Sequence, residues 1–312
     1  MIRLKAAVAG INDAGVRVGL AAKPVRRENP VMPNPISDPL TPNVIVDDLT
    51  SVVKLESTPE GVATITINRP DRRNAFDSLT IEALTEVFET LHGADHVRLV
   101  FLRGAGPAFC AGGDFEWTAQ ATELTEDDNR ADAMTLAHMF KRLTEIPAVT
   151  VALVHGPAFG GGAGLVAACD YAVAVSSARF AFSEVKVGLT PSVVAPYIVN
   201  AIGPRAARAL FVTGRTFGAD EALRLGLVQE LAADSAELEA VAQRLTREVM
   251  AAAPEAVVEA RRLVWDVWGR PIDHGLMEQT ARSLAHRRVS EEAKEGVAAF
   301  RAKRRPSWAG PV

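Results

Sequence analysis

The sequence predicts an α/β fold followed by a helical C-terminal region, and three observations support this. Short apolar segments alternate with segments of helical periodicity between residues 52 and 182. Glycine-rich loops follow two of the apolar segments. From Val194 onward the chain is rich in Ala, Leu, Arg and Glu. We therefore expect strands with covering helices, and then an all-helical tail over about the last hundred residues.

The individual elements follow from local patterns. Strands are predicted at 52–55, 62–67, 97–102, 148–154, 171–175 and 179–182, and helices at 79–91 and 131–143. In the first helix, Leu79, Leu84, Val87, Phe88 and Leu91 share one face and are expected to be buried. The run at 148–154 is apolar throughout, which is typical of a strand covered on both faces.

Three regions are expected along the chain. Residues 1–48 form a basic and then proline-rich extension, 49–250 the core, and 251–312 a helical region for trimerisation. Asp13 and Glu28 argue against a transit peptide, so a disordered extension or a translation start at Met32 is favoured. Whether the extension is native, processed or the result of a misplaced start stays open.

Composition excludes several classes of function. The 312 residues are 48% hydrophobic and 23% charged, with a formal net charge of −4. Basic residues are dispersed and no apolar run is as long as a membrane span, so neither nucleic acid nor membrane is an expected partner. Cys110 and Cys169 stand alone, which argues against a zinc site and predicts a reducing, cytoplasmic location. No metal and no separate cofactor are expected.

Two glycine-rich loops carry the candidate chemistry. The first glycine loop is residues 107–115 and the second is residues 155–164. Each follows an apolar strand, and the second runs into a helix. Glycine lets a ligand approach the backbone closely, and amides at a helix N-terminus favour negative charge. Together the loops can aim two N–H groups at one oxygen, as an enolate or thioester oxyanion requires.

A nucleotide-binding interpretation of the second loop is disfavoured. Residues 162–167 match G-x-G-x-x-A, and Glu184 follows at about the spacing of a dinucleotide fingerprint. The preceding strand ends near Val154, however, so a dinucleotide turn should begin there. That interpretation also leaves the first loop without a purpose.

Short motifs occur in a fixed order between residues 52 and 306. They are INRP and RNA within 67–75, AFCAGGD at 108–114, GGG and D within 160–170, FSEV and GLTP within 182–191, TG, A and GLV within 213–228, and EG, F and KR within 295–304. Each motif is weak alone. As an ordered set they resemble the crotonase, or enoyl-CoA hydratase/isomerase, superfamily, which implies a spiral of ββα units with a C-terminal helical region.

The resemblance implies roles for single positions. Gly113 and Gly161 match residues whose amides form an oxyanion hole. Positions implied to bind coenzyme A are Arg73, Ala75, Ala111, Asp114, Phe115, Phe300 and Lys303. The last two are implied to reach it from a neighbouring subunit, because such proteins are usually trimers or dimers of trimers. Coenzyme A is then part of the substrate.

The acidic residues of this sequence differ from those of the family in one position. Hydratases of this family use two glutamates; the later one matches Glu184, whereas the earlier one falls on Gly164. A lone carboxylate can move a proton between two carbons, which is isomerisation, or serve a bound water, which is hydration. Residues 183–197 are more similar to bacterial hydratases of branched or carboxylated enoyl-CoAs, such as methylglutaconyl-CoA, than to straight-chain enzymes.

We therefore expect an enoyl-CoA hydratase, with Glu184, Gly113 and Gly161 as its catalytic groups. A double-bond isomerase is the alternative, and a non-catalytic acyl-CoA-binding protein is an alternative of another class. A thioesterase or dehalogenase would need a nucleophilic Asp, and Asp170 and Asp220 lie outside the matching positions. The acyl group is not predicted.

Other polar residues are expected to play smaller parts. Glu116 and Trp117 can shape the acyl pocket, with Glu116 a weak candidate for a substitute acid. His155 is expected to be structural, and Asp170 to cap or orient its loop. The two cysteines are expected to be small core residues, because no basic partner accompanies them.

Overall fold

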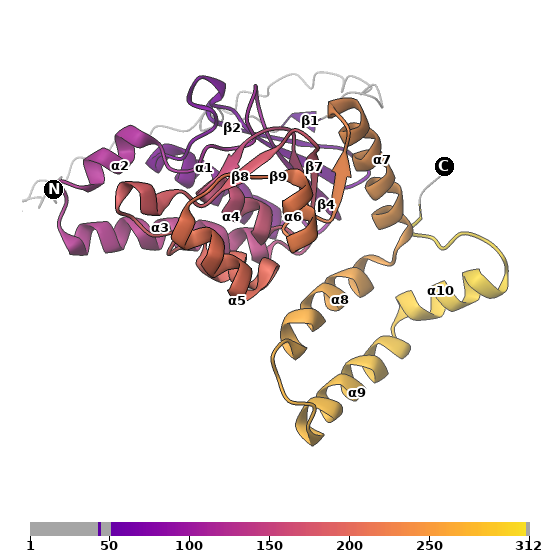
Figure 1. The fold of residues 1–312 in the computed structure, drawn as a ribbon. Coiled ribbons are helices and arrows are strands. Elements are labelled where there is room, and N and C mark those ends of the chain that lie inside the picture. Colours follow the sequence, from indigo (N-terminus) through magenta and orange to yellow (C-terminus); the bar gives the residue numbers. More distant parts are fainter. Residues whose placement is uncertain (1–42, 45–50, 310–312) are drawn as a thin grey trace, which may run out of the picture. The chain divides into compact units, whose positions relative to one another are not determined.

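The computed structural model describes residues 43–44 and 51–309 (Figure 1). The expectations for residues 1–48 therefore concern positions outside the described ones, except for Asn43 and Val44. These two residues form β1 (Asn43–Val44), which pairs antiparallel with β2 (Val53–Ser57). Residues 43–44 and 51–309 belong to a compact unit that begins at Pro42.

A seven-stranded sheet forms the centre of this unit. Its order is β1-β2-β3-β4-β5-β7-β10. The first three strands pair antiparallel, and β3 (Val62–Ile67) onward pair parallel through β4 (Leu99–Gly104), β5 (Val149–Val154), β7 (Tyr171–Val175) and β10 (Glu230–Ala232). All but the first residue of β5 are buried, as its apolar run predicts for a strand covered on both faces.

A second, three-stranded sheet lies next to the glycine loops. It joins β6 (Ala158–Phe159), β8 (Arg179–Ala181) and β9 (Phe217–Gly218) in the order β6-β8-β9. Strand β6 belongs to the second glycine loop, and β8 leads directly to the segment that carries Glu184. The small sheet therefore brings that segment next to the second loop.

The helices of the core differ in part from the sequence expectation. They are α1 (Ser78–His92), α2 (Phe115–Ala121), α3 (Glu126–Glu145), α4 (Gly161–Ala168), α5 (Ala195–Thr213), α6 (Ala219–Leu225) and α7 (Ser235–Ala251). The prediction that Leu79 is buried is wrong, since it is 45% exposed and the buried face of α1 is set by Ile81, Leu84, Phe88 and Leu91. Asp77 accepts a hydrogen bond from the Thr80 amide and fixes the start of α1 there.

The expected all-helical tail is also interrupted. Strand β9 closes the small sheet, and β10 adds an edge strand to the large one, parallel to β7. Both are short, so their apolar residues are too few to show a period of two. Composition alone therefore does not predict these two strands.

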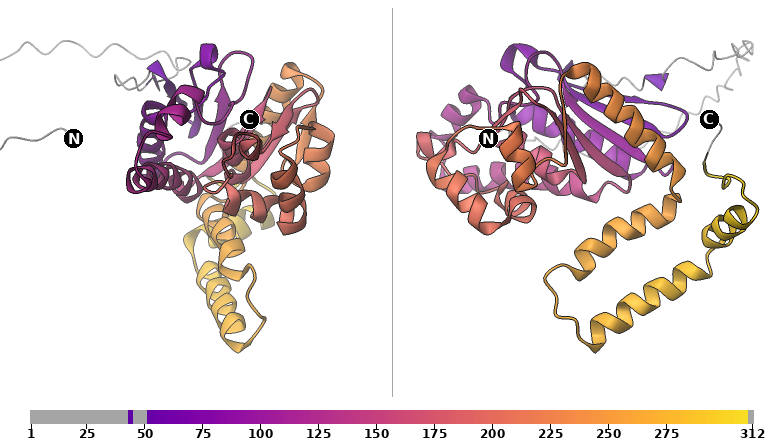
Figure 2. Two further views of the ribbon diagram at one scale, coloured as in Figure 1. Left: turned by 60° about the vertical axis from the view of Figure 1, so that its left-hand side comes forward. Right: turned by 45° about the vertical axis from the view of Figure 1, so that its right-hand side comes forward.

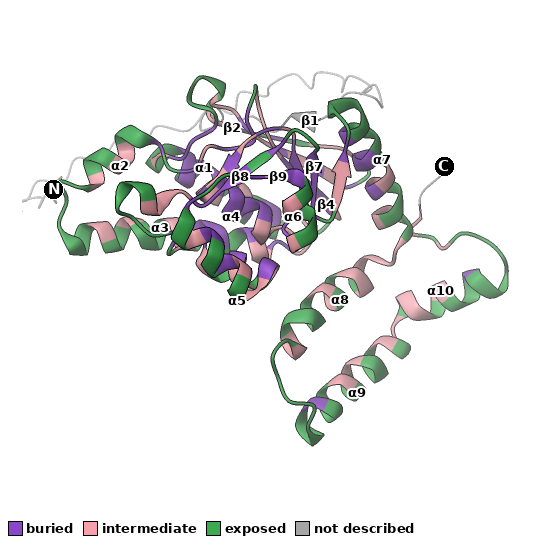
Figure 3. Cartoon of the chain, viewed as in Figure 1, coloured by how far each residue is buried: buried purple, intermediate pink, exposed green. Residues whose placement is uncertain are grey.

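Three further helices follow the core. They are α8 (Pro254–Val267), α9 (His274–Arg288) and α10 (Glu291–Arg301), and two views show them next to one another (Figure 2). Buried residues concentrate in the sheets and core helices, whereas α8 to α10 are mostly exposed or half-buried (Figure 3). No helix of the described part of the chain combines the length and hydrophobicity of a membrane span.

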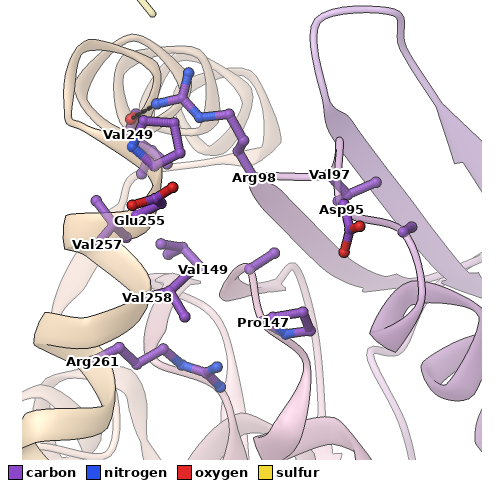
Figure 4. Close-up of a pocket in the computed structure, with 13 residues that line it drawn as sticks. Asp95, Val97, Arg98, Pro147, Val149, Val249, Glu255, Val257, Val258 and Arg261 are labelled. Carbon is purple, nitrogen blue, oxygen red and sulfur yellow. Dashed lines mark hydrogen bonds between the residues drawn. The ribbon is translucent and has the colours of Figure 1, made fainter. Parts of the chain in front are cut away.

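Two arginines connect the C-terminal part of the chain to the core. The Arg98 guanidinium donates to the carbonyl oxygens of Val249 and Ala252 at the end of α7 and to that of Trp308. It lines an apolar cavity between α8 and the starts of β4 and β5 (Figure 4). Arg261 on α8 donates to the Asp170 carboxylate and to carbonyls at the end of α3.

Candidate active site

The first glycine loop is paired along the segment that follows β3. The Phe76 amide donates to the Gly112 carbonyl at 2.7 Å, and the Asp114 amide donates to the Phe76 carbonyl at 2.6 Å. The Ala111 amide donates to the Arg73 carbonyl at 3.0 Å. These bonds make a short parallel bridge between Phe76 and Gly113. Gly113 is thereby held by its neighbours while its own amide stays free of the ladder.

The second glycine loop lies on the other side of the first. The Phe159 amide donates to the Cys110 carbonyl at 2.9 Å, and Cys110 bridges Ala158 in β6. A Cβ atom placed on Gly112 would lie 2.8 Å from the Phe159 oxygen and 3.4 Å from the Gly161 nitrogen. With a φ of 90° as well, position 112 needs glycine. The two backbones therefore pass each other with no side chain between them.

The amides of Gly113 and Gly161 both lack an acceptor. Neither N–H donates a hydrogen bond to any residue of the ranges 43–44 and 51–309. Gly161 is the first residue of α4, where the amides have no partner within the helix and form the positive end of its dipole. Gly113 is exposed and Gly161 is half-buried. Both N–H groups are available to an oxygen that enters between the loops.

Glu184 lies beside the second glycine loop. It begins the 3-10 helix η3 (Glu184–Val187), just after β8. A Cβ on Gly160, the residue before Gly161, would come within 2.9 Å of its Oε1 atom. Its Oε2 atom is buried and has no hydrogen-bond partner among the described residues. Burial raises the pKa of this carboxyl, and its own backbone amide offsets part of that rise.

The position of the missing first glutamate is filled by another side chain. A Cβ on Gly164 in α4 would lie 2.4 Å from Cγ1 of Val194 and 3.1 Å from Cε1 of Phe140. Val194 and Phe140 are both buried. Position 164 therefore has no room for an acid in this packing, and Glu184 has no second carboxylate from α4 beside it.

This contact predicts a stability effect. Gly164→Ala is expected to lower the free energy of unfolding by about 1–3 kcal/mol, because the new methyl group overlaps Val194 in a close-packed region. Val194→Ala in the same chain should relieve part of that loss. A double-mutant cycle by chemical denaturation measures this coupling; additive losses would show that the two positions do not compete for space.

Five of the positions matched to coenzyme A lie around the first glycine loop. Arg73 is exposed with a left-handed φ of 51°, Ala75 is buried and Ala111 is half-buried. Asp114 is only 6% exposed, and its carboxylate caps α2 by accepting from the Glu116 amide at 2.9 Å. Phe115, the first residue of α2, is 79% exposed. The structure brings these five together with Gly113.

Phe300 and Lys303 are not brought to the glycine loops within this chain. Phe300 is 85% exposed on α10, and Lys303 follows that helix with a left-handed φ of 54°. Figure 1 shows α10 apart from α2 and α4. Across the described ranges, neither residue forms a side-chain hydrogen bond or ion pair with either loop.

Sequence reasoning missed two residues that hold the loops. Asn74 is fully buried, and its amide group donates to the carbonyls of Ala105 (2.8 Å) and Ala108 (2.7 Å) while accepting from the Arg69 amide (2.9 Å). Arg69 forms an ion pair with Asp77 at 2.7 Å and donates to the Ala75 carbonyl. Both belong to motifs that the sequence showed, but nothing in the sequence indicates which carbonyls they reach.

The other polar residues singled out in the sequence form hydrogen bonds or ion pairs with their neighbours in the fold. Glu116 is exposed and pairs with Arg72 at 3.2 Å, which gives no support to a role as a substitute acid. His155 contacts the Gly106 carbonyl through Nε2 at 2.9 Å, in line with a structural role, and burial lowers its pKa. Asp170 accepts from the Thr150 amide at 2.8 Å and from Arg261, so within the described part of the chain its carboxylate joins β5 to α8.

Neither cysteine is poised as a nucleophile. Burial raises the pKa of Cys110 to about 12 and that of Cys169 still further. Both thiols are therefore protonated near neutral pH. Nor do the described residues contain a group of three or more His, Cys, Asp and Glu side chains that could hold a metal ion.

Comparison with known proteins places this arrangement in a family. The family model described as enoyl-CoA hydratase/isomerase matches residues 57–311. A protein of Thermus thermophilus named an enoyl-CoA hydratase is 37% identical over 247 residues, covering 79% of this chain and 97% of that protein. A 1,4-dihydroxy-2-naphthoyl-CoA synthase of Mycobacterium tuberculosis is 31% identical over 271 residues, covering 80% and 84%.

Solved structures agree with these relatives. The crystal structure of an enoyl-CoA hydratase from Shewanella pealeana superimposes with a TM-score of 0.79 at 34% identity, covering 82% of this chain and 96% of that one. The mixed α/β core with a helical C-terminal region is therefore the crotonase fold that the motifs implied. The chain is a member of the enoyl-CoA hydratase/isomerase family.

Proposed function

We propose that this protein is an enoyl-CoA hydratase that adds water to a 2-enoyl-CoA. The thioester oxygen of the substrate accepts hydrogen bonds from the amides of Gly113 and Gly161, and Glu184 carries the proton. The supporting observation is that two backbone amides on adjacent loops lie beside a half-buried carboxylate. Among the described residues, both amides and one oxygen of this carboxylate have no hydrogen-bond partner. The names of the similar hydratases support the same reaction.

One carboxylate suffices for hydration. Ionised Glu184 takes a proton from water as the hydroxyl oxygen bonds to C3, and the C2–C3 π electrons move toward the thioester carbonyl. The two amides stabilise the resulting enolate oxygen. Protonated Glu184 then gives its proton to C2, so that one water is added and the carboxylate is restored. Hydrogen and hydroxyl are thus delivered to the same face of the double bond.

Double-bond isomerisation is the second candidate, and one observation favours it. Val194 fills the space beside Gly164, so that Glu184 has no second acid from α4. A lone base next to a stabilised enolate can take a proton from C4 and return it to C2. The same amides and the same carboxylate would serve both reactions.

A panel of straight, branched and carboxylated enoyl-CoAs distinguishes these functions. Mass spectrometry detects the gain of one water, and ultraviolet absorbance follows the loss or gain of conjugation with the thioester. We expect water addition to at least one 2-enoyl-CoA. Shifted double bonds without added water would assign the isomerase, and saturable binding with no turnover across the panel would assign a non-catalytic acyl-CoA binder.

The pH dependence of turnover tests whether Glu184 acts as the base. Glu184 must be ionised to activate water, and burial raises its pKa above the ordinary 4.5. The rate kcat/KM should therefore be low in acid and rise with pH through a midpoint above 4.5. A rate that is already maximal at pH 4.5 would contradict a buried carboxylate base.

We further propose a cytoplasmic protein that assembles into homotrimers or dimers of trimers, with no separate cofactor. Large apolar side chains are exposed along α8 to α10, including Trp265 (55%), Trp268 (65%), Ile272 (85%) and Phe300 (85%). Such surfaces commonly mark contacts between chains. In an assembly of this kind Phe300 and Lys303 can meet coenzyme A on a neighbouring subunit.

A further inference from the structure

We propose that Phe76 is a positioning residue that sets the separation of the two amides, its backbone aiming one of them and its ring limiting the position of the other. This inference rests on the proposed use of Gly113 and Gly161 as donors to a thioester oxygen. Phe76 lies in neither glycine loop and is buried to 1% exposure. It therefore acts on the reaction through other residues.

The backbone of Phe76 aims the Gly113 amide. The Gly112 carbonyl, which accepts from the Phe76 amide at 2.7 Å, belongs to the same peptide unit as the Gly113 N–H. In a trans peptide the C=O and N–H groups lie in one plane and point in opposite directions. The bond from Phe76 therefore turns the Gly113 N–H away from the ladder. The Asp114 amide, bonded to the Phe76 carbonyl at 2.6 Å, fixes the other side of Gly113.

The ring of Phe76 contacts the other donor residue. A Cβ placed on Gly161 would lie 2.6 Å from Cε2 and 2.9 Å from Cδ2 of this ring. The ring therefore lies against the start of α4 and limits how closely Gly161 approaches the first loop. One side chain and its own backbone thus connect both donors, so a shift of Phe76 changes their separation directly.

Arg69 holds the segment that carries Phe76. Its guanidinium donates to the Ala75 carbonyl, pairs with Asp77 at 2.7 Å and lies 3.5 Å from the Asp114 carboxylate. These groups flank Phe76 on one strand of the bridge and Gly113 on the other. The Arg69 side chain is 15% exposed, so the connection is largely shielded from water. Lysine has a single ammonium group and cannot present the same planar set of donors.

A matched pair of variants tests the role of the ring. Phe76→Leu should lower kcat by about 10–10²-fold with little change in KM, because a donor displaced by a fraction of an ångström stabilises the enolate less well. Phe88→Leu is the control, since Phe88 is equally buried but lies in α1. The control should lose similar stability and keep its kcat. Equal values of kcat in the two variants would overturn the inference.

A spectroscopic readout separates positioning from general destabilisation and from the identity of the reaction. Butanoyl-CoA labelled with ¹³C at the thioester carbonyl cannot be hydrated, and its carbonyl stretch falls when hydrogen bonds polarise it. On wild type and Phe88→Leu the bound stretch should lie below that of free butanoyl-CoA, and on Phe76→Leu the difference should shrink. An undiminished difference on Phe76→Leu would contradict the inference. A polarised carbonyl without turnover on any enoyl-CoA would refute the proposed function and leave this inference standing.

Two further pairs of variants keep the test decisive. If Phe76→Leu does not fold, Phe76→Met and Phe88→Met replace the pair, because the flexible, unbranched methionine side chain fills irregular gaps in a core. Arg69→Lys should reduce kcat and the carbonyl shift in the same direction as Phe76→Leu. Arg215→Lys, at a surface pair with Glu221, should change neither. A carbonyl shift that survives in both Phe76→Met and Arg69→Lys would contradict the inference.

Discussion

Replacement of Glu184 by glutamine is expected to lower turnover by about 10²–10⁴-fold while leaving the affinity for an acyl-CoA nearly unchanged. Glutamine has almost the same shape but cannot accept the proton of water. The amides of Gly113 and Gly161 remain in place, so binding of the thioester is retained. Steady-state kinetics on the best enoyl-CoA of the panel, with calorimetric titration of butanoyl-CoA, measures both effects.

Stability provides the internal control for this variant. The raised pKa of Glu184 means that the buried, ionised carboxylate costs free energy in the folded state, and this cost grows as pH rises from 4.5 through the raised pKa. Neutral glutamine removes it, so Glu184→Gln should be at least as stable as wild type at neutral pH. Glu89→Gln, at a surface ion pair with Arg142, should keep full turnover. Unchanged turnover in Glu184→Gln would remove this residue from the mechanism.

Asn74→Ala is expected to produce the largest loss of stability, about 2–4 kcal/mol. The substitution leaves the buried carbonyl of Ala108, the half-buried carbonyl of Ala105 and the half-buried Arg69 amide without a partner at one point in the fold. Each buried polar group that loses its partner costs about 1–3 kcal/mol, partly offset where water can enter. Chemical denaturation monitored by circular dichroism measures the change.

A second asparagine supplies the comparison. Asn68 donates a single exposed hydrogen bond, to the Ser51 carbonyl at 2.9 Å. Asn68→Ala should therefore cost about 1 kcal/mol or less. If Asn74→Ala cost no more than Asn68→Ala, the hydrogen bonds of Asn74 would not be what holds the first loop to the residues before it.

Much of the fold could be predicted because long elements carry a clear period. Strand β3 alternates buried and half-buried residues, and β5 is apolar along its length, as predicted from 62–67 and 148–154. The prediction that Leu79 is buried is wrong because the N-cap at Asp77 and tertiary packing set the buried face of α1. They bury Ile81 and leave Leu79 exposed. Strands β9 and β10 are two and three residues long, and their pairing depends on contacts distant in sequence.

The sequence indicated the glycines of the candidate site, but not the residues that hold those glycines in place. Stabilising an oxyanion requires free backbone amides, and proton transfer requires an acid. Glycines at positions 113 and 161 and a glutamate at position 184 matched these requirements. Phe76 and Asn74 could not be identified in the same way. Their contribution is a set of contacts with Gly112, Gly161 and Ala108, and such contacts exist only once the loops are folded against one another.

A crystal structure of the Glu184→Gln protein with a bound enoyl-CoA tests the central claim most directly. The account predicts that the thioester oxygen lies about 2.7–3.1 Å from the backbone nitrogens of both Gly113 and Gly161. A thioester oxygen that contacts only one of these nitrogens, or neither, would contradict it.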